Sequence, residues 1–257
     1  MILIDVHAHL ELFGDGLDAV IQRAKAAGVK KIVAQGVNPY TNRQVLDIAE
    51  RYDIVEPALG IYPQDALKRE VESEGDDHPF QVTDFDFDEE LRFIERSKPV
   101  ALGEIGLDYK NCTDPDQQKE RFVKFIGLGR KLDIPLIIHS RKAEQDVIDL
   151  LEQNGAKKVI LHCFSGKLKL VKRAADLGYS FSVPTNIVRS EHFQKMVEMV
   201  NISQLLTETD APYLSPFPDR KNEPAFIIET IKVMARIKGM TEEDVANNIF
   251  MNYQRLF

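Results

Sequence analysis

The amino-acid sequence predicts an α/β protein built as a closed (β/α)8 barrel, the TIM barrel. Short runs rich in β-branched residues alternate regularly with longer amphipathic segments, and eight such runs are found in 257 residues. The first run lacks the G-x-G-x-x-G turn that is typical of a doubly wound dinucleotide-binding sheet, which is the competing architecture. The length lies near the upper size of one hydrophobic core, so we expect a single domain over residues 1–257.

Eight strands are expected where short apolar runs are bounded by turn residues. They lie at residues 2–9, 30–37, 54–62, 99–107, 134–140, 157–164, 179–184 and 202–210. Helices are expected between them, where apolar residues recur with helical spacing. They lie at residues 17–28, 42–53, 88–98, 115–133, 144–155, 169–178, 191–201 and 225–239.

Several expected helices have residues at their ends that are typical of helix termination or capping. Glycine stands just past the apolar pattern at four of them, where a left-handed residue can close a helix: Gly28, Gly155, Gly178 and Gly239. One more helix is expected from the capping box that begins at Thr241 to the C-terminus.

The connection at residues 63–86, after the third strand, breaks the regular pattern. It is strongly acidic and much longer than the few residues usual between a strand and the next helix. Its place in the chain puts it at the C-terminal mouth of the barrel. Two interpretations stay open, a solvated surface excursion and a lid that restricts the substrate.

The charge balance limits the function classes. Acidic residues number 41 against 33 Lys and Arg, which gives a net charge of −8. This argues against a protein that coats DNA, because such proteins bind phosphates through an excess of Lys and Arg. An enzyme that takes a nucleic acid by its end is still compatible, since a bound metal supplies positive charge that composition does not count.

The apolar segments and the cysteines of the chain indicate the expected compartment. No window approaches 18 consecutive apolar residues, and Asp5, His7 and His9 interrupt the N-terminal apolar stretch that a signal peptide would need. We therefore expect a soluble protein that does not interact with membranes. Two cysteines cannot build a disulfide framework, which favours a reducing cytoplasm. The sequence indicates no protein partner.

Histidine and carboxylate side chains, which commonly bind metal ions, lie at the ends of the expected strands. In the first strand Asp5, His7 and His9 follow the two-residue period, so they are expected on one face. The carboxyl ends of barrel strands converge on one mouth, where barrel enzymes place their chemistry. Four other strands contribute further candidates to this mouth: Glu104, His139, His162 and Asp210.

Each candidate has a structural alternative when it is taken alone. Glu104 could cap a helix, Asp210 could open a turn, and His139 could be a hydrogen-bonded core residue. Together they favour a metal site, because an imidazole at the end of an apolar strand needs a polar partner. Four imidazoles and two carboxylates exceed the ligands of one tetrahedral zinc with an open position and suit two ions about 3.5–4 Å apart. Zn, Mn, Co and Mg stay open.

The remaining histidines and cysteines are given ordinary roles. His78 and His192 are expected on the surface, in the acidic connection and on a helix. Cys163 is expected to be buried, pointing away from His162, and no role is assigned to Cys112.

Seven motifs, in this order and spacing, resemble the TatD family of metal-dependent hydrolases. The resemblance runs from the first strand to the C-terminus and leaves out mainly the acidic connection. It implies a TIM barrel of the amidohydrolase superfamily, two divalent ions and deoxyribonuclease activity on DNA ends, often 3′ to 5′ exonucleolytic. The motifs are DVHAHL, LGIYP, GEIGLDY, HSR, HCFSG, ETDAPYLSP and NYQRLF.

The resemblance also implies roles for single residues. His7 and His9 would hold the first ion with Asp210, and His139 and His162 would hold the second. Glu104 would bridge the two ions, and Asp210 would also act as base or proton shuttle for the attacking water.

Phosphate contacts are implied less specifically. Arg141, Ser165 and Gly166 are candidates, although Arg141 could equally form a salt bridge at the rim of the barrel. Many family members have Gly-x-His-Pro after the third strand, whereas this chain has Tyr62 in place of that histidine. A phenol, with a reference pKa of about 10, cannot supply the proton chemistry of an imidazole near neutral pH.

Three functions stay open. The favoured function is a metal-dependent phosphodiesterase that acts on DNA ends. The second is a hydrolase of a small ester, amide or phosphate compound, which the negative charge and Tyr62 support. The third is a binding or scaffold protein that keeps the barrel without turnover. No nucleophile elbow, P-loop or Cys-His signature favours another chemistry.

Overall fold

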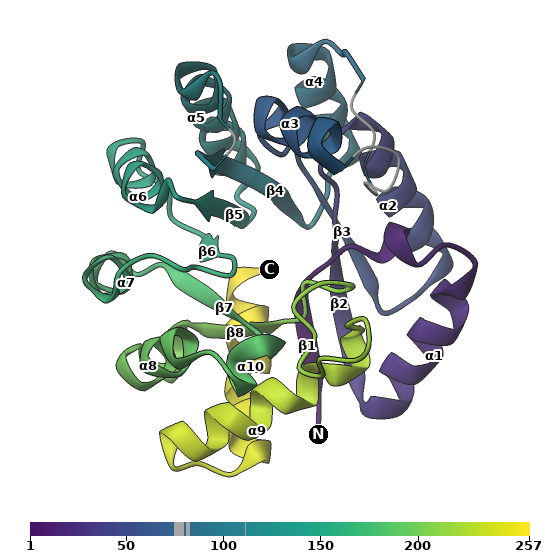
Figure 1. Ribbon diagram of the computed structural model, residues 1–257, viewed down its shortest axis with the longest axis vertical. Coiled ribbons are helices and arrows are strands. Elements are labelled where there is room, and N and C mark those ends of the chain that lie inside the picture. Colours follow the sequence, from purple (N-terminus) through teal and green to yellow (C-terminus); the bar gives the residue numbers. More distant parts are fainter. Residues whose placement is uncertain (75–79, 81–82, 111) are drawn as a thin grey trace.

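The eight strands form one parallel sheet in chain order, β1 to β8, with the helices arranged outside it (Figure 1). The computed structural model describes residues 1–74, 80, 83–110 and 112–257. Between β8 and β1 the circle is closed by a parallel bridge of Ala8 with Ala211. The sheet is therefore the TIM barrel that the alternating pattern predicts.

The strands are short and almost entirely buried, as expected of parallel strands covered by helices on the outside. Apolar residues such as Ile105 and Ile138 are fully buried, so the core lies inside the barrel and between barrel and helices. The bounds are β1 Leu3–Ala8, β2 Val29–Gln35, β3 Val55–Leu59, β4 Ala101–Asp108, β5 Leu136–Arg141, β6 Val159–Leu161, β7 Ser180–Pro184 and β8 Leu205–Glu208.

The helices follow the expected order. Gly28 and Gly239 adopt left-handed backbone angles at the ends of α1 and α9, and the side chain of Thr241 caps α10. The bounds are α1 Leu17–Ala27, α2 Pro39–Arg51, α3 Gln64–Glu74, α4 Phe87–Ser97, α5 Pro115–Leu132, α6 Glu144–Gln153, α7 Leu168–Asp176, α8 Glu191–Met199, α9 Ile227–Lys238 and α10 Glu242–Leu256. Short 3-10 helices are η1 Leu10–Gly16, η3 Thr185–Val188, η4 Ile202–Gln204 and η5 Pro224–Phe226.

All eight strands are shorter than predicted, most of all β3, which ends at Leu59 and not at residue 62, β6 and β8. Strand β6 ends at Leu161 and not at residue 164, and β8 ends at Glu208 and not at residue 210. Shortly after each strand end the backbone turns left-handed, with φ 42° at Cys163 and φ 55° at Asp210. An extended strand cannot continue through such an angle, and the turns direct the chain across the mouth of the barrel.

The acidic connection contains a helix that the sequence pattern does not predict. Helix α3 covers residues 64–74, and its Ala66 and Leu67 pack with Val37 and Tyr62 in a small apolar cluster of their own. The segment is therefore attached to the barrel next to β3. Among the described residues, no helix combines the length and apolar composition needed to cross a lipid bilayer.

Candidate metal centre

Four histidines lie together at the C-terminal mouth of the barrel. His7 lies in β1 and His9 directly follows it, His139 lies in β5, and His162 directly follows β6. The rings of His7 and His162 stack with centroids 3.6 Å apart. All four are buried or nearly so, which makes their ring nitrogens dependent on partners inside the site.

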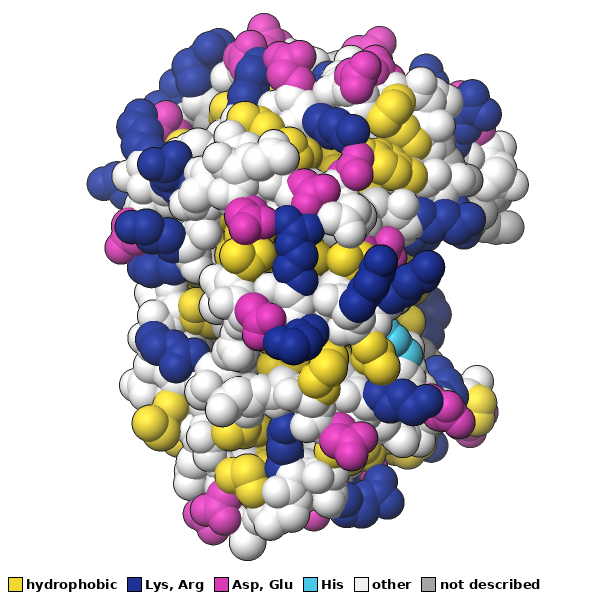
Figure 2. Space-filling view, turned by 90° about the vertical axis from the view of Figure 1, so that its left-hand side faces the viewer, with side chains coloured by type: hydrophobic (Ala, Val, Ile, Leu, Met, Phe, Trp, Pro, Cys, Tyr) yellow, Lys and Arg dark blue, Asp and Glu magenta, His cyan; other side chains and the backbone are white. Residues whose placement is uncertain are grey.

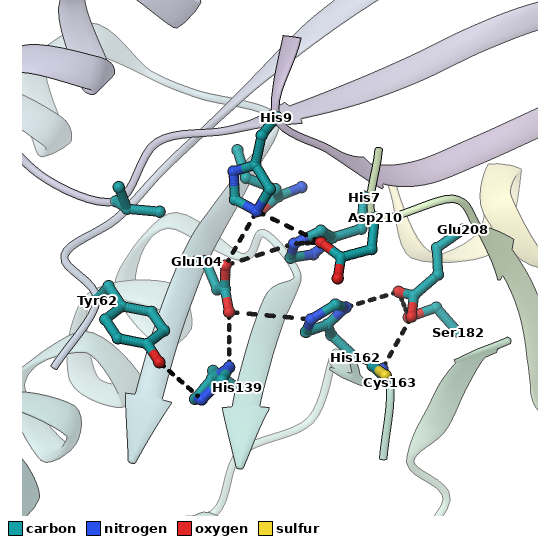
Figure 3. A network of polar contacts seen from close by, with 12 residues as sticks. His7, His9, Tyr62, Glu104, His139, His162, Cys163, Ser182, Glu208 and Asp210 are labelled. Atoms are coloured by element: carbon teal, nitrogen blue, oxygen red, sulfur yellow. Dashed lines mark hydrogen bonds and ion pairs between the residues drawn. The ribbon is translucent and has the colours of Figure 1, made fainter. Parts of the chain in front are cut away.

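Glu104 of β4 lies at the centre of these histidines (Figure 3). Its Oε2 is 3.4 Å from Nε2 of His7 and 3.5 Å from Nε2 of His9. Its Oε1 is 2.7 Å from Nδ1 of His139 and 3.9 Å from Nε2 of His162. One carboxylate thus presents a separate oxygen to each of two histidine pairs.

Asp210 completes the first of these groups. The left-handed turn at Asp210 and the hydrogen bond from its backbone N–H to the carbonyl of His7 direct its side chain over β1. Its Oδ1 lies 3.6 Å from Nε2 of His7 and 3.5 Å from Nε2 of His9.

These spacings fit a metal ion. Tetrahedral ligands with bonds of about 2.1 Å stand about 3.4 Å apart, which is close to the separations around His7 and His9. Nε2 of His7 is also buried and has no hydrogen-bond partner among the described residues, so an ion would satisfy it. Glu104, His139 and His162 form a second group in which three ligand atoms approach one another.

Electrostatics keep the central carboxylates charged. Burial opposes the ionisation of Glu104, but the nearby imidazoles of His139 and His7 hold its pKa well below its ordinary value. Burial likewise opposes the ionisation of Asp210, and the hydrogen bond from His9 lowers its pKa. Both groups are thus available as anionic ligands near neutral pH.

Three carboxylates behind the histidines were missed by sequence reasoning. Glu208 Oε2 lies 2.8 Å from Nδ1 of His162, and Asp108 Oδ2 lies 3.1 Å from Nε2 of His139. Glu11 Oε1 lies 3.6 Å from Nδ1 of His9. Each carboxylate faces the ring nitrogen opposite Glu104, an arrangement that fixes the tautomer and orientation of metal-ligating histidines.

The alternating strand period offers a signal for Asp108, which stands four residues after Glu104 in the same strand β4. It offers none for Glu11, which lies in η1, or for the pair of Glu208 and Asp210, because β8 ends at Glu208. Residues separated by an even number lie on the same face of a strand. Asp5 lies two residues before His7 on β1, but its carboxylate accepts hydrogen bonds from Thr209 and from the backbone of His7, so it connects β1 with the turn after β8.

Comparison with known proteins agrees with this site. The family profile described as "TatD related DNase" matches residues 4–257. The chain is 35% identical to the uncharacterized metal-dependent hydrolase YabD of Bacillus subtilis, over 99% of this chain and 98% of that protein. It is 33% identical to deoxyribonuclease TATDN3 of Homo sapiens, over 99% of this chain and 94% of that protein. The chain belongs to the TatD family of metal-dependent hydrolases.

A solved structure supports the same assignment. The crystal structure of YjjV, a TatD homologue from Escherichia coli, superposes with a TM-score of 0.86 at 28% identity and covers 99% of this chain and 97% of its own. The family resemblance of the sequence motifs is therefore confirmed, together with the barrel and the enzyme class.

The candidate metal centre of this TatD-family hydrolase opens into a cavity of about 590 Å³, called the mouth cavity below. Glu104, His139 and Asp210 line this cavity together with the largely apolar side chains of Leu12 and Tyr213. Its size suits one small molecule or one end of a polymer.

Tyr62 and Arg141 both line the mouth cavity. The Tyr62 hydroxyl donates to Asp108 Oδ2 at 2.6 Å and lies 3.2 Å from Nε2 of His139. Arg141 donates from Nε to the same Asp108 oxygen at 2.6 Å and forms an ion pair with Glu70 of α3. The salt-bridge alternative for Arg141 is therefore seen in the structure, and Arg141 also lines the cavity, where a phosphate contact stays a prediction.

Ser165 does not fit its expected role. Its side chain is exposed, lies 3.4 Å from Glu144 Oε1, and does not line the mouth cavity. The backbone turns at Cys163 and buries Phe164, which leaves the next side chain on the outside. Gly166 approaches the Phe164 ring so closely that a Cβ would lie 2.6 Å from it, and α7 begins only at Leu168.

The remaining expectations have mixed outcomes. Cys163 is partly exposed as a whole residue, but it packs against the hydrophobic core and burial raises the pKa of its thiol, in line with the expectation of a buried side chain. His192 lies on α8 as expected, but it is half-buried and Nε2 lies 3.0 Å from the carbonyl oxygen of Phe164. Cys112 is also partly exposed, and His78 lies outside the described residues.

Proposed function

We propose that this TatD-family hydrolase is a deoxyribonuclease that cleaves phosphodiester bonds at DNA ends with two divalent ions. The observation that carries the proposal is the position of Glu104, whose two oxygens face two separate histidine pairs. A carboxylate in this position suits two ions about 3.5–4 Å apart. The name of the human relative, deoxyribonuclease TATDN3, supports DNA as the substrate.

The ligands are assigned by these separations. His7, His9 and Asp210 would hold the first ion, and His139 and His162 would hold the second, with Glu104 shared. Bound ions would lower the pKa of a water and take up negative charge from the phosphate oxygens. Nitrogen and oxygen donors suit Zn, Mn, Co or Mg, and this donor set selects none of them.

Two side chains would have separate roles in the reaction, proton transfer for Asp210 and a fixed ring position for His139. Asp210 Oδ1 faces His7 and His9, and 15% of its side chain is exposed to the mouth cavity, so its carboxylate can accept the proton of the attacking water. His139 is held between Glu104 and Asp108, which keeps its ring in place during the reaction.

Tyr62 and Arg141 are proposed as substrate contacts. Burial and the nearby Asp108 hold the pKa of Tyr62 well above its usual value, so the phenol stays neutral and orients neighbours by hydrogen bonds. Arg141 presents a guanidinium to the cavity, a group that pairs well with phosphate. Ser165 is not proposed as a contact because it lies outside the cavity. Both cysteines are free thiols, which supports the cytoplasm as the compartment.

The decisive experiment measures turnover of labelled single- and double-stranded oligonucleotides by the metal-reconstituted protein. A panel of small esters, amides and phosphate compounds is run beside them, because the mouth cavity of about 590 Å³ also suits a small substrate. Cleavage of DNA that is lost in His139→Ala supports the proposal. Turnover confined to the small compounds would favour the second candidate, a small-molecule hydrolase.

A further inference from the structure

Two exposed lysines line the mouth cavity on opposite sides of the metal centre. Lys110 lies two residues after β4, and Lys221 lies in the long connection after β8, where its neighbour Asn222 binds the carbonyl of Thr209. Strands β4 and β8 stand four positions apart in the eight-stranded barrel. Glu104 and Asp210, at the centre of the proposed site, line the same cavity. A DNA strand that crosses the mouth of the barrel over these carboxylates would therefore pass one lysine on each side of the candidate metal centre.

These lysines differ from Arg141, the third cation of the cavity. Arg141 is held by Asp108, by Glu70 and by the Tyr62 hydroxyl. Within the part of the chain that the structure describes, neither Lys110 nor Lys221 has an ion pair or a side-chain hydrogen bond. Their ammonium groups are thus free to bind an anion from outside.

Buried polar groups hold the backbone at both lysines. The backbone N–H of Lys110 donates to Asp108 Oδ1 at 2.8 Å. Next to Lys221, the buried side chain of Asn222 donates to the carbonyl of Thr209 at 2.7 Å. The points from which the two lysines extend are therefore fixed relative to β4 and β8.

On the outer face of the molecule that Figure 2 shows, the described residues form no continuous patch of positive charge. Basic and acidic side chains are interspersed on this face, with apolar patches between them. A phosphate backbone binds along continuous positive charge, which such a mixed face does not provide. In a chain of net charge −8, unpaired cations at the mouth are well placed to direct a polyanion to the site.

We propose that Lys110 and Lys221 form two phosphate subsites that flank the metal centre and make the protein prefer a scissile phosphodiester with a further phosphate beside it. The inference rests on the proposed nuclease function and specifies its substrate. A dinucleotide with a terminal 5′- or 3′-phosphate is then a better substrate than the same dinucleotide with hydroxyl ends.

The test uses thymidine dinucleotides with hydroxyl ends, with a 5′-phosphate or with a 3′-phosphate. Each terminal phosphate is expected to raise kcat/KM about tenfold in the parent protein, the scale of one charge-assisted hydrogen bond. Lys110→Met is expected to abolish the preference for one terminal phosphate, and Lys221→Met the preference for the other. Lys157→Met, an exposed lysine away from the mouth cavity, is the matched control and should keep both preferences.

Binding provides a readout that is independent of turnover. Fluorescence anisotropy with base-labelled dinucleotides and chelator-treated protein should show the same two preferences and the same two losses. Equal binding of all three dinucleotides by the parent, or unchanged preferences in both lysine variants, would overturn the lysine subsites. If no dinucleotide is hydrolysed but the binding preferences follow the lysines, the nuclease proposal fails and the subsites stand.

Discussion

Glu208 Oε2 lies 2.8 Å from Nδ1 of His162, on the side of the ring opposite Glu104. The same carboxylate accepts hydrogen bonds from the Ser182 hydroxyl and from the backbone N–H of Cys163. Three partners from β7 and the turn after β6 therefore fix its position. A carboxylate held in this way directs Nε2 of His162 toward the metal centre.

Replacing the Glu208 carboxylate should weaken the binding of one metal ion more than the binding of the other. We expect Glu208→Gln to lower metal affinity about 10- to 100-fold at the site that includes His162, because outer partners of metal-ligating histidines contribute on that scale. Titration with a competing chelator measures the two affinities. Glu198→Gln, an exposed change on α8, is the control. Equal weakening of both ions would contradict the assignment of His162 to the second one.

Protons and metal ions should compete for His162. Burial disfavours its charge, but Glu208 raises the pKa of His162 to about 9, compared with 6.5 as the ordinary value. The bound proton therefore stabilises the metal-free fold fully below about pH 6.5, and this contribution is lost as the pH rises through 9. The loss amounts to at most about 3 kcal/mol in the free energy of unfolding.

Denaturant unfolding in the presence of chelator measures this dependence. We expect the metal-free protein to lose stability between pH 6.5 and pH 9, and Glu208→Gln to flatten the profile. Metal binding at pH 7 should release protons, which calorimetry detects as a binding enthalpy that depends on the buffer. A binding enthalpy that is the same in all buffers would count against a protonated His162.

The sequence predicts which candidate ligand side chains come together better than it predicts the carboxylates behind them. In a barrel the carboxyl ends of all strands meet at one mouth, so His139 and His162 can be placed together from the strand pattern alone. The carboxylates Glu208 and Asp108 were missed because their role depends on which ring nitrogen each one faces, and this is a property of side-chain direction.

The differences in the fold have a similar origin. The left-handed angles at Cys163 and Asp210 shorten β6 and β8, and neither residue is a glycine that would announce such a turn. Helix α3 was not predicted because the acidic residues of the connection suggest a solvated loop, whereas Ala66 and Leu67 give it a small core of its own.

Helix α3 brings a negative charge to the mouth, because Glu70 lines the cavity and pairs with Arg141. We expect Glu70→Gln to raise kcat/KM on long single-stranded DNA more than on a dinucleotide, since it removes repulsion and releases Arg141. The difference should shrink at high salt, where exposed charges are screened. Glu72→Gln, an exposed change of the same charge on the same helix, is the control. If both variants have equal effects on both substrates, the connection at residues 63–86 is only a solvated surface segment and does not restrict the substrate.

Tyr62 stands where the motif resemblance implies a histidine, and its hydroxyl donates to Asp108. Because the pKa of this buried phenol lies well above its usual value, we expect it to orient Asp108 and His139 without exchanging a proton. Tyr62→Phe should then reduce kcat only about threefold to tenfold, the scale of one neutral hydrogen bond. The pH profile of kcat should keep its shape. A missing limb in that profile would show that the phenol takes part in proton transfer.

Asp210 allows metal binding to be separated from chemistry. Asparagine keeps the size and one carbonyl oxygen as a weak ligand but cannot accept a proton. Asp210→Asn should therefore retain at least one ion and bind substrate, and should lose about 100-fold or more in turnover, the usual scale of general acid–base catalysis. His7→Ala should lose metal and activity together, because Nε2 of His7 lies within 3.6 Å of both Glu104 and Asp210. Elemental analysis and turnover at saturating metal distinguish the two variants, since weakened affinity alone could imitate lost catalysis. Near-normal turnover of Asp210→Asn under those conditions would move the proton-accepting role away from Asp210, and Glu104, which also lines the cavity, would be the next residue to replace.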